Sequence, residues 1–259
     1  MKHKIFYFTG TGNSLWAARV LSSKLQDSEI IPILNPSLNA IKESETIGVV
    51  YPVYMHRIPY LVADFIKTLP ELDYLYAVAI NAGDTGQTFT YFKKHLSTEQ
   101  NTLKAGFSIV TPSNYLPFGE AVDGRKRDRM LSTARVKIER VSKIIRNRKS
   151  FFDKEDGFYK KRVYPGMLYF AGYRFLHFLD KKFYIEDSCT SCGICEKVCP
   201  VGNITRPEGK PVWNNNCQLC FACINLCPES SIQFGNKTSG MRRYRNPKVT
   251  VEDIINQKS

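Results

Sequence analysis

The sequence predicts an α/β fold, a doubly wound parallel sheet of five strands, followed by a smaller α+β domain that contains all the cysteines. Three observations lead to this prediction. Short apolar runs alternate with helical patterns over the first 110 residues, which is typical of a parallel sheet covered on both faces. A glycine-containing loop links the first run to the first helix. The 8 cysteines stand between residues 189 and 227, in two runs of identical spacing.

Five apolar runs are expected to form the strands of the sheet. They are residues 4–8, 30–34, 46–51, 76–80 and 105–110. The second run contains Pro32, which lacks a backbone N–H, so we place it at an edge of the sheet. Helices are expected at residues 15–21 and 60–68. A further helix with a basic outer face is predicted by an apolar stripe at helical spacing, made of Met130, Leu131, Ala134, Ile138, Val141 and Ile145.

The loop at residues 9–14, Thr-Gly-Thr-Gly-Asn-Ser, has the composition of an anion site at a helix N-terminus. Its glycines let backbone N–H groups turn inward, and its hydroxyl and amide side chains add donors. It contains no lysine, unlike the loop that binds nucleoside triphosphates. Leu15 stands where the dinucleotide-binding fingerprint requires a third glycine. The loop therefore favours the phosphate of flavin mononucleotide (FMN), and an ordinary glycine turn is the alternative.

The two cysteine runs both read C-x2-C-x2-C-x3-C-P and lie 28 residues apart. This spacing is that of bacterial proteins with two [4Fe–4S] clusters, in which the fourth cysteine of each run ligates the other cluster. One cluster is therefore assigned to Cys189, Cys192, Cys195 and Cys227. The other cluster is assigned to Cys217, Cys220, Cys223 and Cys199.

Zinc sites and disulfides are the alternatives for these cysteines. Two C-x2-C pairs supply the four ligands of a structural zinc, with no need for a third cysteine or a trailing proline. Disulfide frameworks are typical of small secreted chains, below about 80 residues. Neither alternative explains the repeated triplet, so we favour iron–sulfur clusters.

At the N-terminus, FTGTGNS after a strand resembles the phosphate loop of flavodoxins. Together with the C-terminal cysteine repeat, it resembles the flavodoxin–ferredoxin fusion proteins, or ferrodoxins. The resemblance covers nearly the whole chain and is strongest at residues 5–14 and 186–234. It implies a flavodoxin-like fold, a C-terminal ferredoxin-type domain with two [4Fe–4S] clusters, and an FMN. The residues that it assigns to the FMN phosphate are Thr9, Thr11, Gly12, Asn13 and Ser14.

Four segments follow from these motifs. Residues 1–150 are predicted to be the flavodoxin-like FMN-binding domain, and residues 151–183 a basic and aromatic connecting segment. Residues 184–236 are predicted to be the ferredoxin domain. Residues 237–259 form a C-terminal tail, in which residues 249–251 are expected to be a short strand and no chemistry is expected.

The loops that follow the strands are expected to contact the flavin, because ligands bind beyond the carboxyl ends of the strands in such sheets. Tyr54 is the first candidate and Tyr115 the second for covering the flat isoalloxazine ring, with surface exposure and packing as the alternatives. The loop that begins at Pro52 and the residues Asn81, Gly83 and Asp84 are candidates for contacts with the ring edge. A helix cap is the alternative role for Asp84.

The formal net charge of +13 is concentrated at residues 125–182, which hold 18 Lys and Arg against 6 Asp and Glu. We favour a solvated helix face for most of these charges, and steering of an acidic electron carrier is the alternative. Nucleic-acid binding is not expected, because no recognition motif accompanies the charge. The aromatic stretch at residues 164–179 is expected to pack the two domains together rather than to bind a membrane surface.

These features predict an electron-transfer flavoprotein, with a redox protein as its partner. A reductase of small molecules is one alternative, with His56, Arg57 and Tyr115 lining its pocket. An accessory subunit of a larger redox complex is another. No acid–base or nucleophile constellation points to a dedicated organic substrate. A cytoplasmic location, in an anaerobe, is expected from the absence of an apolar leader and from the need of such clusters for a reducing compartment.

Overall fold

The computed structural model describes residues 3–36, 41, 44, 46–96, 102–155 and 176–258. Its larger part is a parallel sheet of six strands in the order β2-β1-β3-β4-β5-β6. The strands are β1 (His3–Tyr7), β2 (Ser28–Pro32), β3 (Thr46–Pro52), β4 (Tyr74–Asn81), β5 (Leu103–Val110) and β6 (Phe151–Phe152). The first five have the 2-1-3-4-5 order of flavodoxin-like folds. The predicted fold class is therefore confirmed.

The sixth strand was not predicted. β6 pairs in parallel with β5, through Ala105 with Phe151 and Gly106 with Phe152. The Phe151 ring also stacks on Phe107, with ring centroids 5.7 Å apart. A strand of two residues is too short to show a hydrophobic period, so only its pairing reveals it. The boundary predicted after residue 150 falls immediately before this strand.

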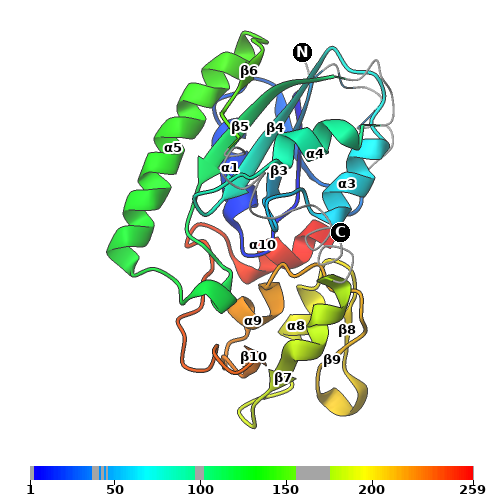
Figure 1. Cartoon of the computed structure of the whole chain (residues 1–259), viewed down its shortest axis with the longest axis vertical. Helices are drawn as coiled ribbons and strands as arrows, with labels where there is room; N and C mark the ends of the chain where they lie inside the picture. The colour runs from blue at the N-terminus through cyan, green and yellow to red at the C-terminus, as the bar shows by residue number, and fades with distance from the viewer. Residues whose placement is uncertain are drawn as a thin grey trace, which may run out of the picture.

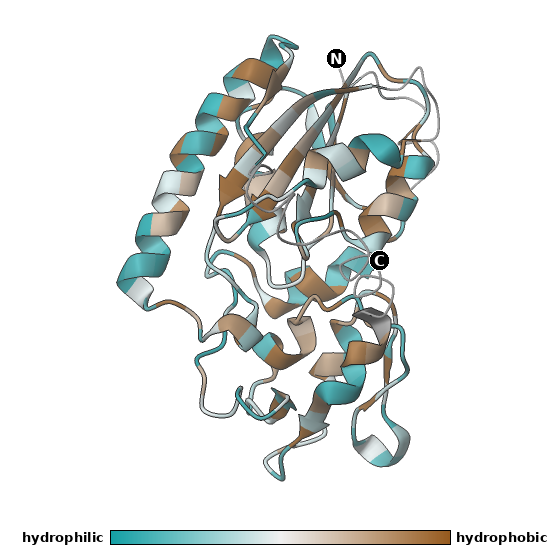
Figure 2. Ribbon diagram, in the orientation of Figure 1, coloured by the Kyte–Doolittle hydropathy of each residue, from teal (hydrophilic) through white to brown (hydrophobic). Residues whose placement is uncertain are grey.

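Among the described residues, four helices cover the sheet. They are α1 (Asn13–Ser22), α3 (Tyr60–Lys67), α4 (Thr88–Lys94) and α5 (Gly124–Arg146). α1 and α5 pack together on one face, and α3 and α4 lie on the other (Figure 1). The apolar stripe of α5 is buried at Leu131, Ala134 and Ile138, and the helix begins where the Asp123 carboxylate accepts a hydrogen bond from the backbone of Lys126. The outward face of α5 is hydrophilic (Figure 2), as predicted.

Burial within the sheet follows the sequence pattern. All eight residues of β4 are buried, and so are six of the seven residues of β3. Only Ile31 is buried in β2. β2 has a single neighbour, β1, so the edge position predicted from Pro32 is confirmed. The apolar core therefore lies around the central strands, and their carboxyl ends carry the loops of interest.

The second region is a small α+β unit below the sheet in Figure 1. β7 (Phe183–Ile185) pairs antiparallel with β10 (Ile232–Phe234), and β8 (Ile204–Thr205) pairs antiparallel with β9 (Val212–Trp213). The short helices α8 (Ile194–Lys197) and α9 (Ala222–Leu226) pack on each other. Aromatic rings fill the space between them and the strands, with Phe183 stacked on Trp213 at 5.2 Å.

The tail runs back between the two regions, where it forms α10 (Val251–Ile255). The expected strand at residues 249–251 is wrong. Thr250 instead caps the helix, because its hydroxyl accepts from the Asp253 backbone and the Asp253 carboxylate accepts from the Thr250 N–H. Short turns η1 (Leu116–Phe118), η2 (Leu176–Lys182), η3 (Pro207–Gly209) and η4 (Asn256–Lys258) complete the described secondary structure.

In the part of the chain that the structure describes, no helix has both the length and the apolar character needed to cross a membrane. Most of the aromatic stretch at residues 164–179, for which packing and membrane roles were weighed, lies outside the described residues.

Candidate functional site

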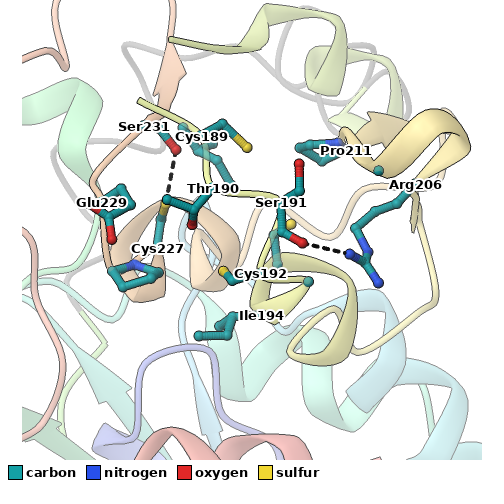
Figure 3. A pocket seen from close by; sticks show the side chains of 15 residues that line it. Cys189, Thr190, Ser191, Cys192, Ile194, Arg206, Pro211, Cys227, Glu229 and Ser231 are labelled. Atoms are coloured by element: carbon teal, nitrogen blue, oxygen red, sulfur yellow. Dashed lines mark hydrogen bonds between the residues drawn. The ribbon is translucent and has the colours of Figure 1, made fainter. Parts of the chain in front are cut away.

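The eight cysteines gather around two separate pockets. Cys189, Cys192 and Cys195 surround one pocket together with Cys227, which follows α9 (Figure 3). We call these four residues the outer set, because the Cys192 side chain is exposed. Each predicted four-cysteine group is thus brought together in space.

The second pocket is lined by Cys199, Cys217, Cys220 and Cys223, which we call the inner set. Cys199, Cys220 and Cys223 are buried. The exchange of the fourth cysteine follows from the local chain. α8 is only four residues long, so Cys199 emerges just beyond it on the side of the other run, and Cys227 emerges just beyond α9 in the same way.

All eight cysteines are free thiols, so the disulfide alternative does not describe this structure. Within the described ranges, no group of three or more His, Cys, Asp or Glu residues is arranged to hold a single metal ion. The cysteines of each set instead stand around an open space. This is the arrangement that a cluster with four outlying thiolate ligands requires.

Burial raises the pKa of the thiols that lie deepest. The pKa of Cys195 is raised to about 11 and that of Cys220 to about 12, in both cases mainly by desolvation. Burial also raises the pKa of Cys223 and Cys217. Apolar surroundings therefore disfavour the free thiolate form of these cysteines, and a bound metal would supply the positive charge that stabilises it.

Backbone N–H groups donate to sulfur within the inner set. The N–H of Asn203 lies 3.2 Å from the Sγ of Cys199, and the N–H of Leu219 lies 3.3 Å from the Sγ of Cys217. In the outer set, the Sγ of Cys227 lies 3.2 Å from the hydroxyl of Ser231. Such hydrogen bonds to ligand sulfur are one of the means by which a protein tunes a cluster.

The loop between β1 and α1 retains free backbone donors. The N–H groups of Gly10, Thr11, Asn13, Ser14 and Leu15 have no acceptor among the residues that the structure describes. Gly12 has φ of 100°, which turns the chain into the helix, and its N–H donates to the hydroxyl of Thr9 at 3.0 Å. Unpartnered N–H groups at the start of a ten-residue helix fit an anion such as a phosphate group.

The side chain of Asn13 has a different role from the predicted one. Its amide donates to the Thr111 hydroxyl at 3.1 Å and to the Pro112 carbonyl at 3.0 Å. Its oxygen accepts from the Tyr244 hydroxyl at 2.6 Å and from the Asn246 amide at 2.9 Å. Because both amide hydrogens are used, only the backbone of Asn13 is available to a phosphate.

The C-terminal tail covers this loop, and sequence reasoning missed it. The side-chain amide of Gln257 pairs with both backbone groups of Thr9, at 3.2 and 3.1 Å, and the Asn246 N–H donates to the Thr11 carbonyl at 2.9 Å. A side chain at Gly12 would meet Val249 at 2.8 Å. Local sequence patterns do not predict these contacts, because each contact joins residues that are far apart in the chain.

The inner set lies against the same loop. A Cβ placed on Gly10 would be 2.6 Å from the carbonyl oxygen of Cys220 and 3.1 Å from the hydroxyl of Tyr54. That hydroxyl is buried and has no partner among the described residues. Burial raises the pKa of Tyr54, and the neighbouring Cys220 thiolate adds to the effect. Gly10, Tyr54 and the inner set therefore meet at one point.

The other predicted flavin contacts are engaged in their own loops. Asn81 donates to Ser108 at 2.9 Å and accepts from the Gly83 N–H at 2.9 Å, which closes a turn after β4. The Asp84 carboxylate accepts from the Gly86 N–H at 2.7 Å. It does not cap α4, because the residue at the cap position is Gln87. Pro52 ends β3.

Tyr115 lies elsewhere. Its ring contacts Phe118 and Phe221, each with centroids 4.8 Å away, in edge-to-face geometry. It is partly buried and packs against the hydrophobic cluster of the cysteine-rich region. The structure thus brings Tyr54 to the loop between β1 and α1, whereas Tyr115 packs against the cysteine-rich region.

The 4Fe-4S binding domain family matches residues 182–205 of this chain. A polyferredoxin-like protein of Methanocaldococcus jannaschii is 40% identical over 48 residues, which are 18% of this chain and 21% of that protein. One of the subunits of the F(420)H(2) dehydrogenase of Methanosarcina mazei is 26% identical over 72 residues, which are 23% of this chain and 21% of that one. The matching parts thus span about a fifth of these curated relatives.

Solved structures were also compared. A flavodoxin from the domain Archaea has 17% identity and a TM-score of 0.38, with 56% of this chain and 99% of that chain covered. A flavodoxin of Streptococcus pneumoniae has 16% identity and a TM-score of 0.35, with 52% and 95% covered.

The strand order and the family match together define the class of this protein. It joins a flavodoxin-like α/β domain to a 4Fe-4S ferredoxin-type region.

Proposed function

We propose that this protein is an electron-transfer iron–sulfur flavoprotein, which passes electrons between two [4Fe–4S] clusters and an FMN. A flavin exchanges one or two electrons and each cluster exchanges one, so their combination links two-electron to one-electron chemistry. The observation that carries the proposal is the contact of the inner set with the phosphate loop. The Cys220 carbonyl packs directly on Gly10, beside the buried hydroxyl of Tyr54.

Each group of residues has a distinct role in this proposal. The outer set and the inner set would each ligate one cluster. The backbone N–H groups around Gly12, with the hydroxyls of Thr9, Thr11 and Ser14, would hold the phosphate. Tyr54 would border the flavin on the side of the inner set. The tail would hold the loop in place through Gln257.

The different exposure of the two sets supports a path for electrons through the molecule. Cys192 is exposed, whereas Cys220 is buried against the loop. The outer set would therefore exchange electrons with an external redox protein, and the inner set with the flavin. An acidic partner suits the exposed cations of α5, such as Arg129, Arg140 and Lys143. A reducing compartment such as the cytoplasm would keep the clusters intact.

Anaerobic purification followed by assays of iron, sulfide and released flavin tests this proposal. The expected result is about eight irons, eight sulfides and one FMN per chain. Iron without flavin would remove the flavin from the scheme and leave a two-cluster electron carrier. Zinc in place of iron would overturn it entirely.

A second candidate is an accessory subunit of a larger redox complex. It is favoured by one relative, whose name describes it as part of a dehydrogenase. Co-purification with a redox complex at low salt, lost at high salt, would support this role. A flavin reductase of small molecules is less favoured, because Arg57 lies 4.1 Å over the Tyr91 ring, His56 pairs with Asp84 at 3.3 Å and Tyr115 packs on Phe221.

A further inference from the structure

The two cysteine sets differ in the charges that surround them. Beside the outer set lies Arg243, which belongs to the tail. Its Nη2 donates to the carbonyls of Ser230 and Ile232, at 3.3 and 3.2 Å, and to the side-chain oxygen of Gln233 at 2.9 Å. These acceptors lie a few residues after Cys227 in the chain. The guanidinium is thus held in one position next to an outer ligand.

The remaining donors of Arg243 are buried and lack an acceptor. Its Nε and Nη1 have no hydrogen-bond partner in the described part of the chain. Burial lowers the pKa of Arg243, and the charge that opposes this most is the thiolate of Cys227, ahead of the carboxylate of Glu186. A partly buried cation with two donors that lack an acceptor therefore lies near Cys227 of the outer set. A thiolate-ligated cluster carries the negative charge that would satisfy it.

Other charges near the outer set largely cancel. Arg206 lies over Gly193, but its Nε donates to the Glu196 carboxylate at 2.7 Å. Glu229 also lines the pocket, but it is exposed, so water screens it. Lys210 donates from its Nζ to the Cys189 carbonyl at 2.9 Å, but it is exposed, so water screens its charge. Arg243 is thus the partly buried cation near the outer set whose charge no described carboxylate pairs with.

The inner set has the opposite charge beside it. Asp180 is only 1% exposed, and its Oδ2 accepts from the Asn203 amide and the Asn215 N–H, both at 2.9 Å. Its Oδ1 has no partner in the described ranges. Burial and the Cys220 thiolate raise the pKa of Cys217, and the Asp180 carboxylate raises it further. A buried negative charge therefore lies close to an inner ligand.

Two neutral features act on the inner set as well. The apolar side chains of Val201, Ile204 and Ala222 line its pocket, and Ile204 and Ala222 are themselves buried. Burial raises the pKa of Cys223, and the indole N–H of Trp213 opposes this effect. The dipole of one N–H is weaker than the full charge of a buried carboxylate, so the inner site as a whole disfavours added negative charge.

Reduction adds one electron to a cluster and makes it more negative by one unit. A nearby cation and exposure to water stabilise the reduced form, whereas a buried carboxylate and apolar walls destabilise it. We propose that the cluster of the outer set has the higher reduction potential, and that Arg243 and Asp180 set this order. This inference rests on the two clusters of the proposed function.

The order has a consequence for electron entry. The first electron from a one-electron protein donor goes to the outer cluster, and the donor is oxidised by one electron with no proton transferred. The inner cluster, which lies beside the phosphate loop, is reduced by the next electron, and this needs a stronger reductant. Arg243 and Asp180 are not cluster ligands in this scheme. Each acts through its charge, which shifts the reduction potential of the nearby cluster.

The test is a redox titration of the anaerobically purified full chain, with dithionite as reductant and electron paramagnetic resonance as readout. The variants are Arg243→Gln, Arg243→Lys and Asp180→Asn. Arg242→Gln is the matched control, because Arg242 is the exposed neighbour that pairs with Glu120 at 2.7 Å. The parent protein is expected to show two one-electron steps of different potential.

Arg243→Gln is expected to lower the reduction equilibrium constant of the higher step at least tenfold, which is about 59 mV for one electron, and to leave the lower step in place. Arg243→Lys keeps the charge, so its reduction equilibrium constant for the higher step is expected to stay within about threefold of the parent value. The same is expected of Arg242→Gln. Asp180→Asn is expected to raise the constant of the lower step at least tenfold. These shifts in potential would not arise from a purely structural role.

The proposal is overturned if Arg243→Gln moves the lower step, if it moves neither step, or if both variants move the same step. Should Arg243→Gln lose iron, Asp180→Asn and Arg243→Lys still decide the question through the lower and higher steps. A failure of the proposed function is distinguishable, because the parent protein would then contain fewer than eight irons or no flavin before any titration.

Discussion

The first and second cysteine runs have the same spacing but lie in opposite surroundings. Between its cysteines the first run carries Thr190, Ser191 and Gly193, and its second cysteine is exposed. The second run carries Leu219 and Phe221, and its second cysteine is buried against Gly10 in the loop between β1 and α1. Identical ligand patterns can therefore build one site for the surface and one for the interior, because the residues between the ligands decide the environment.

Removing the exchanged cysteines, Cys199 and Cys227, gives the largest expected effect and tests which run completes each cluster. Cys199→Ala is expected to abolish the inner cluster although Cys199 belongs to the first run, and Cys227→Ala to abolish the outer one. Each variant should lose about four of eight irons. The measurement is iron per chain together with the resonance signal that survives. If Cys199→Ala left the inner signal intact, the exchanged assignment would be wrong.

The different exposure of the two sets predicts that their clusters degrade in air at different rates. Because Cys192 is exposed and the inner cysteines are mostly buried, the outer cluster is expected to degrade first in air, roughly tenfold or more ahead of the inner one. Loss of the two resonance signals with time after admission of oxygen measures this. Cys227→Ala, which lacks the outer cluster, serves as the control and should show only the slow phase. Equal rates for both signals would contradict the assignment of inner and outer sets.

The contact between the inner set and the loop can be tested at Gly10. A methyl group there would meet the Cys220 carbonyl at 2.6 Å, so Gly10→Ala is expected to cost about 1–3 kcal/mol of unfolding free energy. Anaerobic urea unfolding measures the change. Gly124→Ala is the matched control, since its methyl would approach only Arg127, at 3.7 Å. A similar stability for both variants would argue against close docking of the two regions.

The smallest expected effect concerns the tail. Tyr244→Phe removes the hydrogen bond to Asn13 and leaves the one from Asn246, so the cost is about 1 kcal/mol. Hydrogen exchange of the Asn246 amide, which donates to Thr11, should accelerate about fivefold. Tyr184→Phe, at a tyrosine that is 44% exposed, should leave that exchange rate unchanged. An unchanged rate in Tyr244→Phe would mean that the tail does not depend on Asn13.

Much of the fold follows from local patterns. The five long strands, the edge position of β2 and the buried stripe of α5 all reflect periodicities within a few residues of each other. The two-residue strand β6 has no such period, and the residues at 249–251 have strand propensity but form a helix start. At residues 249–251 the helix start forms despite strand propensity, because the capping box of Thr250 and Asp253 satisfies backbone groups that a strand would leave unpaired.

In the candidate site, too, some features were predicted from local sequence patterns and others were not. The grouping of the cysteines into two sets of four was predicted from spacing, and each set lines one pocket in the structure. The phosphate-binding role of the loop stays a prediction. Tyr115 was a candidate for the flavin because it is an aromatic residue in a loop after a strand, and Asn13 was assigned to the phosphate by the flavodoxin resemblance. In the structure, Tyr115 contacts Phe221 and the Asn13 side chain contacts Tyr244. Both partners are distant in the chain, so no local reading could have found them.

The sequence by itself determined that this protein has a parallel α/β sheet, a glycine-containing loop after the first strand and two runs of four cysteines. Each of these depends on residues close together in the chain. Only the tertiary structure decided which set faces the surface, which set lies on Gly10, and that Arg243 and Asp180 stand beside different sets. The physical reason is that charge, burial and close approach depend on distance in space, which packing alone establishes.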